Sequence, residues 1–294
     1  MPRHLLNGTE LTREDIGALL HRALELKAQP LASRALAGKS VALVFQRPST
    51  RTRLSYEVGV VELGGHALVL RPDEMQLSRG ESVKDTARIL SAHVHAVGVR
   101  TGPDALLEEL AAEGSIPVFI MLTEGHHPSQ GLADLLTLHE AFPGVPFDKL
   151  KLAYVGDGNN VARSLALMGT IAGVDVAVAS PPGYELEPES GGTRTNDPRE
   201  AVAGAHAVYT DVWVSMGDED TADERRAALA PYRVDDALMD AAAPGAVALH
   251  CLPAHPGEEI TADVLYGARQ MIWTQAENRR HAQKALLEWL LEEG

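Results

Sequence analysis

The sequence predicts an α/β protein of two domains, each a mostly parallel sheet flanked by helices. Short apolar runs that are typical of buried strands alternate with helical periodicity along the whole chain. The chain has 294 residues, about twice the length of a common domain. The turn Pro-Gly-Val-Pro at residues 143–146 separates two stretches in which the alternation starts afresh. Strands that alternate with helices form parallel βαβ units, so we expect one such sheet in each domain.

The first domain is predicted to cover residues 1–142. Its first helix, at residues 10–26, has apolar residues at helical spacing. The β-branched and aromatic run at residues 41–45 lies between Gly38 and Pro48, which is typical of a strand. The elements that follow are a helix that carries Leu54, Val58 and Val61 and ends before Gly64, a strand at 67–70, a helix at 83–90, a strand at 96–99, a helix at 103–112, a strand at 117–121 and a helix at 128–142.

The second domain is predicted to cover residues 147–275. Its strands are expected at residues 152–155, 175–179, 207–210, 246–251 and 271–273, and its helices at 161–171 and 198–203. A long amphipathic helix at 276–291 belongs to a C-terminal segment, residues 276–294, that we expect to pack back on the first domain. Residues 180–195 are rich in Pro, Gly and Glu and predict a flexible loop.

The charge balance excludes one class of function. Lys and Arg number 26 against 41 Asp and Glu, and this net charge of −15 argues against a general nucleic-acid binder. No apolar run approaches the ~18 residues of a membrane span, and the first residues lack the apolar run of a signal peptide. The single cysteine, Cys251, excludes an intramolecular disulfide and a cysteine-cluster zinc site. We therefore expect a soluble cytoplasmic protein in which any anionic ligand is held by a local basic cluster.

One segment, Phe45-Gln46-Arg47-Pro48-Ser49-Thr50-Arg51-Thr52-Arg53, is such a cluster. It follows a predicted strand and opens a predicted helix, where free backbone N–H groups and the helix dipole favour an anion. Ser49, Thr50 and Thr52 add hydroxyl donors. Arg51 and Arg53 are suited to bidentate contacts with phosphate oxygens. The alternative is that Ser49 is only a helix N-cap and that the arginines pair with distant carboxylates.

The motif Ser-Thr-Arg-Thr-Arg resembles the carbamoyl phosphate site of the carbamoyltransferases. Four further segments resemble that family's signatures in the same order, and the resemblance runs from the first predicted helix to the last. The last two segments are similar to the ornithine branch of the family. The segments are Gly80-Glu81-Ser82-Val83-Lys84-Asp85-Thr86, then His127-Pro128-Ser129-Gln130 with Leu132-Ala133-Asp134-Leu135-Leu136-Thr137, then Asp211-Val212-Trp213-Val214-Ser215-Met216-Gly217, and His250-Cys251-Leu252-Pro253-Ala254.

The resemblance implies a carbamoyl phosphate site in the first domain. The residues that it assigns to this ligand are Ser49, Thr50, Arg51, Thr52, Arg100, His127 and Gln130, with Arg279 closing the carbamoyl end. Positioned donors of this kind stabilise the negative charge that develops on the carbonyl oxygen during acyl transfer. Gln76 matches the position that a neighbouring subunit contributes, which implies sites shared between chains of a homotrimer or a multiple of trimers.

The resemblance places the amine site in the second domain. Asn160, Asp211, Ser215 and Met216 would surround the α-amino and α-carboxylate groups of ornithine, and Cys251 and Leu252 would lie beside the attacking δ-amine. This amine must lose a proton before it attacks, because amines of its type have a pKa of about 10.4. We therefore hypothesise that Asp211 and Cys251 select the deprotonated amine, the alternative being that Cys251 is a buried small apolar residue.

The function that the resemblance implies is carbamoyl transfer from carbamoyl phosphate to the δ-amine of L-ornithine, giving L-citrulline and phosphate. The active site would lie in the cleft between the domains. Its catalytic residues would be Arg51, Arg100, His127, Asp211, Cys251 and Arg279. The chemistry requires no metal or organic cofactor, and neither nucleic acid nor membrane is an expected partner. The reaction would serve arginine biosynthesis, and the family pattern implies a cis peptide at Leu252-Pro253.

Particular segments disfavour other functions. Transfer to aspartate, putrescine or N-acetylornithine is disfavoured by Ser215-Met216-Gly217. A dinucleotide-binding oxidoreductase is suggested by Gly156-Asp157-Gly158-Asn159-Asn160-Val161, but the third glycine and the ribose-binding acid are missing. A non-catalytic member of the fold is expected to lack one of the assigned site residues, and all of them are present. The acidic residues at 218–224 predict a solvated face of a mobile loop.

Overall fold

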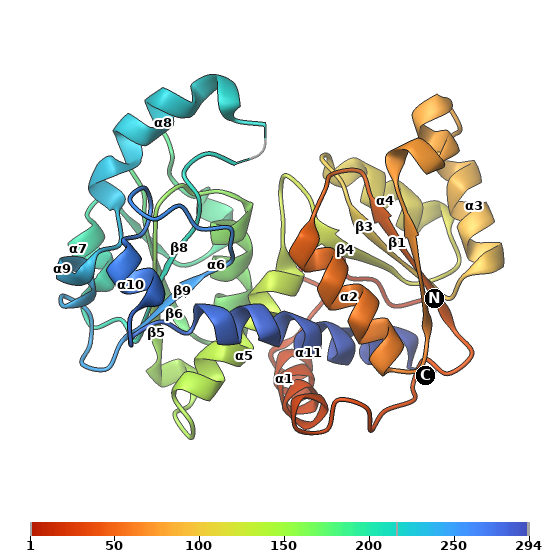
Figure 1. Cartoon of the computed structure of the whole chain (residues 1–294), viewed down its shortest axis with the longest axis horizontal. Helices are drawn as coiled ribbons and strands as arrows, with labels where there is room; N and C mark the ends of the chain where they lie inside the picture. The colour runs from red at the N-terminus through yellow and green to blue at the C-terminus, as the bar shows by residue number, and fades with distance from the viewer. Residues whose placement is uncertain (1, 216, 293–294) are drawn as a thin grey trace. The chain divides into compact units, whose positions relative to one another are not determined.

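The computed structural model describes residues 2–215 and 217–292 (Figure 1). The chain divides into two compact units: unit 1 is Met1–Ala133 with Glu277–Gly294, and unit 2 is Asp134–Ala276. Each unit contains one parallel sheet with helices around it, which confirms the predicted fold class. Among the described helices, none is long and apolar enough to cross a membrane.

Unit 1 is built on a four-stranded sheet of order β2-β1-β3-β4, in which all neighbours are parallel. Parallel neighbours need a crossover, and a helix supplies it after each of the first three strands. The strands are β1 Ser40–Phe45, β2 His66–Leu70, β3 Ala96–Arg100 and β4 Val118–Leu122, and the crossover helices are α2 Thr50–Glu62, α3 Val83–His93 and α4 Asp104–Glu113. These bounds lie within a few residues of those predicted.

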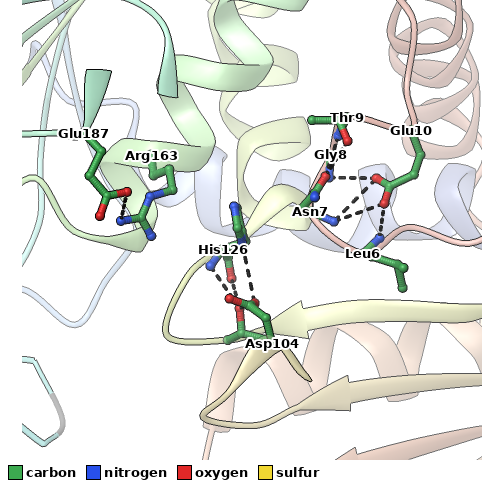
Figure 2. Close-up of polar contacts among 10 residues, drawn as sticks. Leu6, Asn7, Gly8, Thr9, Glu10, Asp104, His126, Arg163 and Glu187 are labelled. Carbon is green, nitrogen blue, oxygen red and sulfur yellow. Dashed lines mark hydrogen bonds and ion pairs between the residues drawn. The ribbon is translucent and has the colours of Figure 1, made fainter. Parts of the chain in front are cut away.

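Residues before the first helix are fixed to unit 1 by backbone pairing and by one carboxylate. Leu5 pairs in parallel with Phe119 of β4. The side chain of Glu10 accepts hydrogen bonds from the backbone N–H groups of Leu6 and Gly8, both at 2.9 Å (Figure 2). Helix α1, Arg13–Ala28, then begins at a capping box formed by Thr12 and Asp15.

The apolar stripe that predicts helix α2 faces outward. Leu54, Val58 and Val61 are 58%, 38% and 63% exposed and lie on one side of the helix. The opposite side is buried, and a Cβ added to Gly59 would lie 3.3 Å from Cγ of Lys284 on α11, Ile272–Leu291. Glycine at this position therefore permits close packing of α2 on α11, while the exposed stripe has the character of an interaction surface.

Unit 2 is built on a five-stranded parallel sheet of order β7-β6-β5-β8-β9. Its apolar core includes Val155, Val208 and Ile260. The strands are β5 Lys151–Val155, β6 Asp175–Ala179, β7 Thr193–Thr195, β8 Ala207–Thr210 and β9 Val247–His250, and the helices are α5 Pro128–Ala141, which begins in unit 1, α6 Asn160–Ala172, α7 Pro198–Val202, α8 Ala222–Leu229, α9 Asp236–Met239 and α10 Ala262–Tyr266.

The strand predicted at residues 271–273 is wrong, because α11 already begins at Ile272. The side chain of Gln270 accepts from the backbone N–H groups of Ile272 at 2.9 Å and Trp273 at 3.4 Å, and so caps the helix start. Glutamine is not among the preferred N-cap residues, so the sequence does not mark this boundary. The only strand-like pairing here is an isolated bridge between Gln270 and Ala248, within the described part of the chain.

Two predicted loops contain regular structure. Residues 180–195, predicted as a flexible loop, end in β7, which pairs in parallel with β6 at the edge of the sheet. The acidic stretch predicted as a mobile loop runs into α8, where Asp223 and Glu224 lie in the first turn. Acidic side chains favour a helix N-terminus, so the charge pattern that suggested a loop also suits this helix start.

A lysine is buried between α1, α2 and α11 in unit 1. Lys284 is 0% exposed, and its Nζ donates to Glu62 Oε2 at 2.6 Å. The same Nζ donates to the backbone carbonyls of Leu26 at 3.2 Å and Pro30 at 3.1 Å. The charge is therefore compensated by one carboxylate and two carbonyl dipoles, as a buried ammonium requires.

Replacing this lysine should weaken unit 1 more than replacing an exposed one. We expect Lys284→Met to lower the free energy of unfolding by about 3–5 kcal/mol, because two backbone carbonyls lose their donor and Glu62 loses its 2.6 Å partner, keeping the longer ion pair with Arg280 at 3.5 Å. Urea titration followed by circular dichroism measures this change. Lys149→Met, at an exposed position, is the control and should lie within about 0.5 kcal/mol of the parent. Equal effects of the two variants would contradict this account of Lys284.

Candidate active site

The basic segment identified in the sequence begins helix α2 of unit 1. Ser49 is the N-cap of this helix, and its Oγ accepts from the backbone N–H of Thr52 at 3.3 Å. The helix follows the carboxyl end of β1, which is where parallel sheets bind ligands. Free N–H groups and the positive end of the helix dipole are thus present at this point, and the N-cap role of Ser49 is compatible with an anion site.

The three arginines of the segment differ in their partners. Arg47 forms an ion pair with Glu124, and Arg53 forms one with Glu57 at 2.8 Å. Arg51 is half-buried and forms no ion pair with the residues that the structure describes. The alternative of plain carboxylate pairing therefore holds for Arg47 and Arg53 but not for Arg51, whose charge remains available for a ligand.

A buried guanidinium in unit 1 joins α11 to the starts of α2 and α5. Arg279 on α11 is 4% exposed and donates to Gln130 Oε1 on α5 at 2.8 Å. Its other terminal nitrogen donates to Thr52 Oγ1 on α2 at 2.6 Å. Thr52 and Gln130 are each 1% exposed. Three residues that the sequence analysis assigned to the anion site are thus brought together by hydrogen bonds.

His127 lies directly before α5 and is buried. The turn that precedes it is fixed by Asp104, which accepts from Thr123 Oγ1 and lies 3.5 Å from Nδ1 of His126 (Figure 2). Burial lowers the pKa of His127 well below its usual value, and the positive charges of Arg279 and Arg100 lower it further. The imidazole is therefore neutral at pH 7 and has one N–H to donate.

Arg100 is the last residue of β3 and is buried. The register with β4 shifts between Val99 and Arg100, and the Arg100 carbonyl accepts from the N–H of Gln46 at 2.8 Å. The carboxyl ends of β1 and β3 are neighbours in the sheet, so the basic segment and Arg100 belong to the same sheet edge.

Thr50 and Gln76 are the exposed members of the assigned set in unit 1. Thr50 is the first residue of α2, and Gln76 lies on the 3-10 turn Gln76–Arg79. Within the described residues, no hydrogen bond or ion pair connects Gln76 to Arg51, Thr52 or Arg279. Its contribution to a neighbouring subunit stays a prediction.

The amine site predicted in unit 2 centres on Asp211, which follows β8 and is buried. Cys251 Sγ donates to Asp211 Oδ1 at 2.9 Å, and Asn159 Nδ2 donates to Asp211 Oδ2 at 3.0 Å. The alternative that Cys251 is merely a small apolar residue does not fit this thiol contact. The sequence analysis did not single out Asn159, although an asparagine before a helix is a recognisable N-cap signal.

The other assigned residues of unit 2 lie near the strand ends. Asn160 is the first residue of α6, and Ser215 is half-buried in the segment between β8 and α8. Leu252 follows β9 with a positive φ of 61°, and the cis peptide expected between Leu252 and Pro253 is confirmed. Met216 lies outside the described residues.

A buried histidine and glutamate hold the segment that carries Cys251. The N–H of Leu252 donates to His250 Nδ1 at 2.8 Å, so this nitrogen carries no proton. Nε2 of His250 therefore carries the proton and donates to Glu259 Oε1 at 3.0 Å. The same oxygen accepts from the N–H of His255 at 2.6 Å, which closes the loop on itself.

A second group that the sequence analysis missed links α8 to the turn after β5. Arg225 donates to Asp157 Oδ2 at 2.7 Å and forms an ion pair with Asp218 at 3.3 Å. Its guanidinium also lies over the ring of Tyr184, 5.3 Å from the centroid. Asp218, predicted to be a solvated loop residue, is thus part of an ion-pair network, and burial raises the pKa of Asp157.

Among the residues that the structure describes, two groups of side chains bring metal-binding atoms within 4.8 Å of one another, Asp211–His250–Cys251 and His255–Glu258–Glu259. In the first group, both nitrogens of His250 are already hydrogen-bonded. In the second group, Glu258 is in an ion pair with Arg226 at 3.2 Å. We assign a metal to neither group.

The fold and these two sets of residues correspond to one class of enzyme. The model of the aspartate/ornithine carbamoyltransferase carbamoyl-P binding domain matches residues 3–140, and that of the Asp/Orn binding domain matches residues 148–290. The chain therefore belongs to the aspartate/ornithine carbamoyltransferase family, as the resemblance of its motifs implied.

Individual relatives point to one branch of this family. The ornithine carbamoyltransferase of Parafrankia sp. (strain EAN1pec) is 48% identical in an alignment that covers 99% of this chain and 96% of the relative. The ornithine carbamoyltransferase of Bacillus subtilis (strain 168) is 46% identical over 99% of this chain and 95% of its own. The solved structure of ornithine carbamoyltransferase from Thermus thermophilus is 40% identical with a TM-score of 0.91, covering 99% of this chain and 100% of that one.

The environment of His127 predicts a histidine that stays neutral well below pH 6.5. Because burial and two nearby guanidinium groups oppose protonation, we expect its ring signals in a ¹H–¹³C NMR spectrum to keep neutral-form shifts from about pH 8 to about pH 5.5. The spectrum of His127→Gln assigns the signal, and the protein unfolded in urea gives the reference titration. A midpoint near the usual value of 6.5 would contradict this environment.

Proposed function

We propose that the protein transfers the carbamoyl group of carbamoyl phosphate to the δ-amine of L-ornithine, giving L-citrulline and phosphate. The observation that carries this proposal is the combination of Arg51, which has no carboxylate partner among the described residues, with the buried hydrogen bonds of Arg279 to Thr52 and Gln130. The relatives named ornithine carbamoyltransferase, aligned over nearly the whole chain, support the same activity.

The first half of the reaction suits the residues of unit 1. The helix N-terminus after Ser49 and the guanidinium of Arg51 are complementary to a phosphate. During attack, negative charge develops on the carbonyl oxygen, and preorganised donors stabilise that state more than the flat substrate. Arg100, Arg279 and the neutral ring of His127 are the donors we assign to this oxygen.

The second half of the reaction suits the residues of unit 2. The Asp211 carboxylate is complementary to the α-ammonium group of an amino acid, and we assign the α-carboxylate to Asn160 and Ser215. The Cys251 thiol lies next to the Asp211 carboxylate and donates a hydrogen bond to it at 2.9 Å. We place it and Leu252 beside the δ-amine, where the pair Asp211 and Cys251 would act as the base that accepts the proton the amine loses.

The choice of amine substrate distinguishes this function from carbamoyl transfer to other amines. With ornithine, N-acetylornithine, putrescine and aspartate in parallel assays of phosphate release, we expect turnover with ornithine alone. Putrescine offers no carboxylate to Asn160 and Ser215, and the acetyl group removes the ammonium that Asp211 would bind. Turnover with another amine would overturn the assignment of unit 2, and a folded protein with no turnover would overturn the catalytic function.

Arginine variants test the anion site in the same assay. Arg51→Ala should weaken the binding of carbamoyl phosphate by about tenfold or more, because it removes a charged hydrogen bond of ~1.5–3 kcal/mol. Arg53→Ala is the matched control, since Arg53 lies two residues away and is already paired with Glu57. Equal losses in both variants would indicate a general charge effect instead of a site at Arg51.

We further propose that the enzyme is a homotrimer with shared active sites. The exposed apolar stripe of α2, formed by Leu54, Val58 and Val61, supports a subunit contact on this helix. Exposed Gln76 is the residue that we assign to the site of the neighbouring chain. Carbamoyl phosphate is assigned to residues 1–142 and ornithine to residues 147–275, which the matches at 3–140 and 148–290 support. We place the reaction in cytoplasmic arginine biosynthesis.

Shared sites predict a recovery of activity when two impaired variants are mixed. Arg51→Ala and Gln76→Ala should each impair every site of a homotrimer. Dissociation, mixing and reassembly produce hybrid trimers in which some sites combine an intact Arg51 with an intact Gln76, so phosphate release should rise above both parents. Light scattering after gel filtration confirms the trimer. Trimeric mixtures without recovery would overturn the sharing of sites, and a monomer with full activity would overturn the trimer.

A further inference from the structure

Asn159 occupies the turn between β5 and α6, next to the residue that we assign to the substrate carboxylate. It is the N-cap of α6, with an extended backbone at φ −76° and ψ −173°. Its Oδ1 accepts from the backbone N–H groups of Val161 at 2.9 Å and Ala162 at 3.1 Å. The side chain is therefore held by the helix that it begins.

This capping fixes which end of the amide faces Asp211. A backbone N–H can only donate, so the atom that faces Val161 and Ala162 must be the amide oxygen. The NH₂ group then points the other way, where Nδ2 lies 3.0 Å from Asp211 Oδ2. The hydroxyl of buried Tyr154 also donates to Asn159 Oδ1, at 3.4 Å. This hydroxyl stays protonated because burial is the main cause that raises its pKa well above the usual value.

The other oxygen of Asp211 is held separately. Cys251 Sγ donates to Oδ1 at 2.9 Å, so each carboxylate oxygen has its own donor from a different strand end. A rotation of the carboxylate plane would break at least one of these hydrogen bonds. Since Asp211 is 5% exposed, water does not readily replace the lost donor.

We propose that Asn159 is a positioning residue for ornithine, which orients the Asp211 carboxylate through Nδ2 while its own amide is locked by the cap of α6. The inference rests on the proposed function, because it takes Asp211 as the group that binds the substrate ammonium. Asn159 itself contacts Asp211 and the helix, so its effect on the substrate is exerted through Asp211.

The cap and the positioning contact make different demands on the side chain. Asparagine, aspartate and serine are almost equally good N-caps, because each offers an oxygen to the backbone N–H groups. Asparagine alone adds a donor at the far end of a planar group. Aspartate would place a carboxylate oxygen against Asp211 Oδ2, and serine has no second polar group that extends to it.

The test compares Asn159→Ser and Asn159→Asp with the parent enzyme in steady-state assays. We expect the KM for ornithine to rise about tenfold or more in both variants, since a hydrogen bond to a charged group is lost. The effect should be larger for Asn159→Asp, where two carboxylates oppose each other. The KM for carbamoyl phosphate should stay within about twofold, because its assigned residues belong to unit 1, and the melting temperature should stay within a few degrees.

Asp235→Asn is the control for capping alone, since Asp235 caps α9 in the same unit through Leu238 N–H at 2.8 Å. It should leave both KM values unchanged. Ornithine KM values equal to the parent in both Asn159 variants would overturn the proposal, as would an equal rise in the KM of both substrates or the loss of the folded protein in both variants. Absence of ornithine turnover in the parent would instead overturn the proposed function, so the two failures are distinguishable.

Discussion

The buried guanidinium of Arg279 is the constraint on which unit 1 depends. It has to be placed where acceptors are available, and the acceptors that it uses, Thr52 and Gln130, come from the starts of two different helices. Because both acceptors are neutral, the positive charge is held in place without being cancelled by them. The same hydrogen bonds that fix α2 and α5 on α11 therefore produce a region of positive potential in a protein whose net charge is −15.

Unit 2 contains a buried group of the opposite charge, the carboxylate of Asp211. Asp211 is satisfied by a thiol and an amide, and each of these donors is itself fixed by a neighbour: Asn159 by the helix that it caps, and Cys251 by a loop closed through His250 and Glu259. Such nested contacts leave little freedom to the group at the centre. The strand ends determine where Asp211 and Cys251 lie, and the polar groups around these two residues determine how their side chains are oriented.

Most of the fold was predictable because the strands are short apolar runs separated by periodic helices. Prediction failed where an element carries little apolar signal or an uncommon cap. The edge strand Thr193–Thr195 is polar because one side faces no neighbour, and the start of α11 is capped by a glutamine. In the site, the motif identified the basic segment and assigned Arg51 to the ligand, but the ion pair of Arg47 could not be predicted, since its partner, Glu124, is distant in sequence. The role of Asn159 likewise depends on Asp211, 52 positions further on.

The division of the chain into two units has a consequence for the order in which they fold during translation. Unit 2 is one continuous segment, Asp134–Ala276, whereas unit 1 is assembled from Met1–Ala133 and the end of the chain. As the polypeptide leaves the ribosome, every residue of unit 2 emerges before Arg279 and Lys284 do. Unit 1 therefore lacks α11 until residues 272–291 have been made. Residues 134–276 can complete their fold first, and the hydrogen bonds of Arg279 to Thr52 and Gln130 form only afterwards.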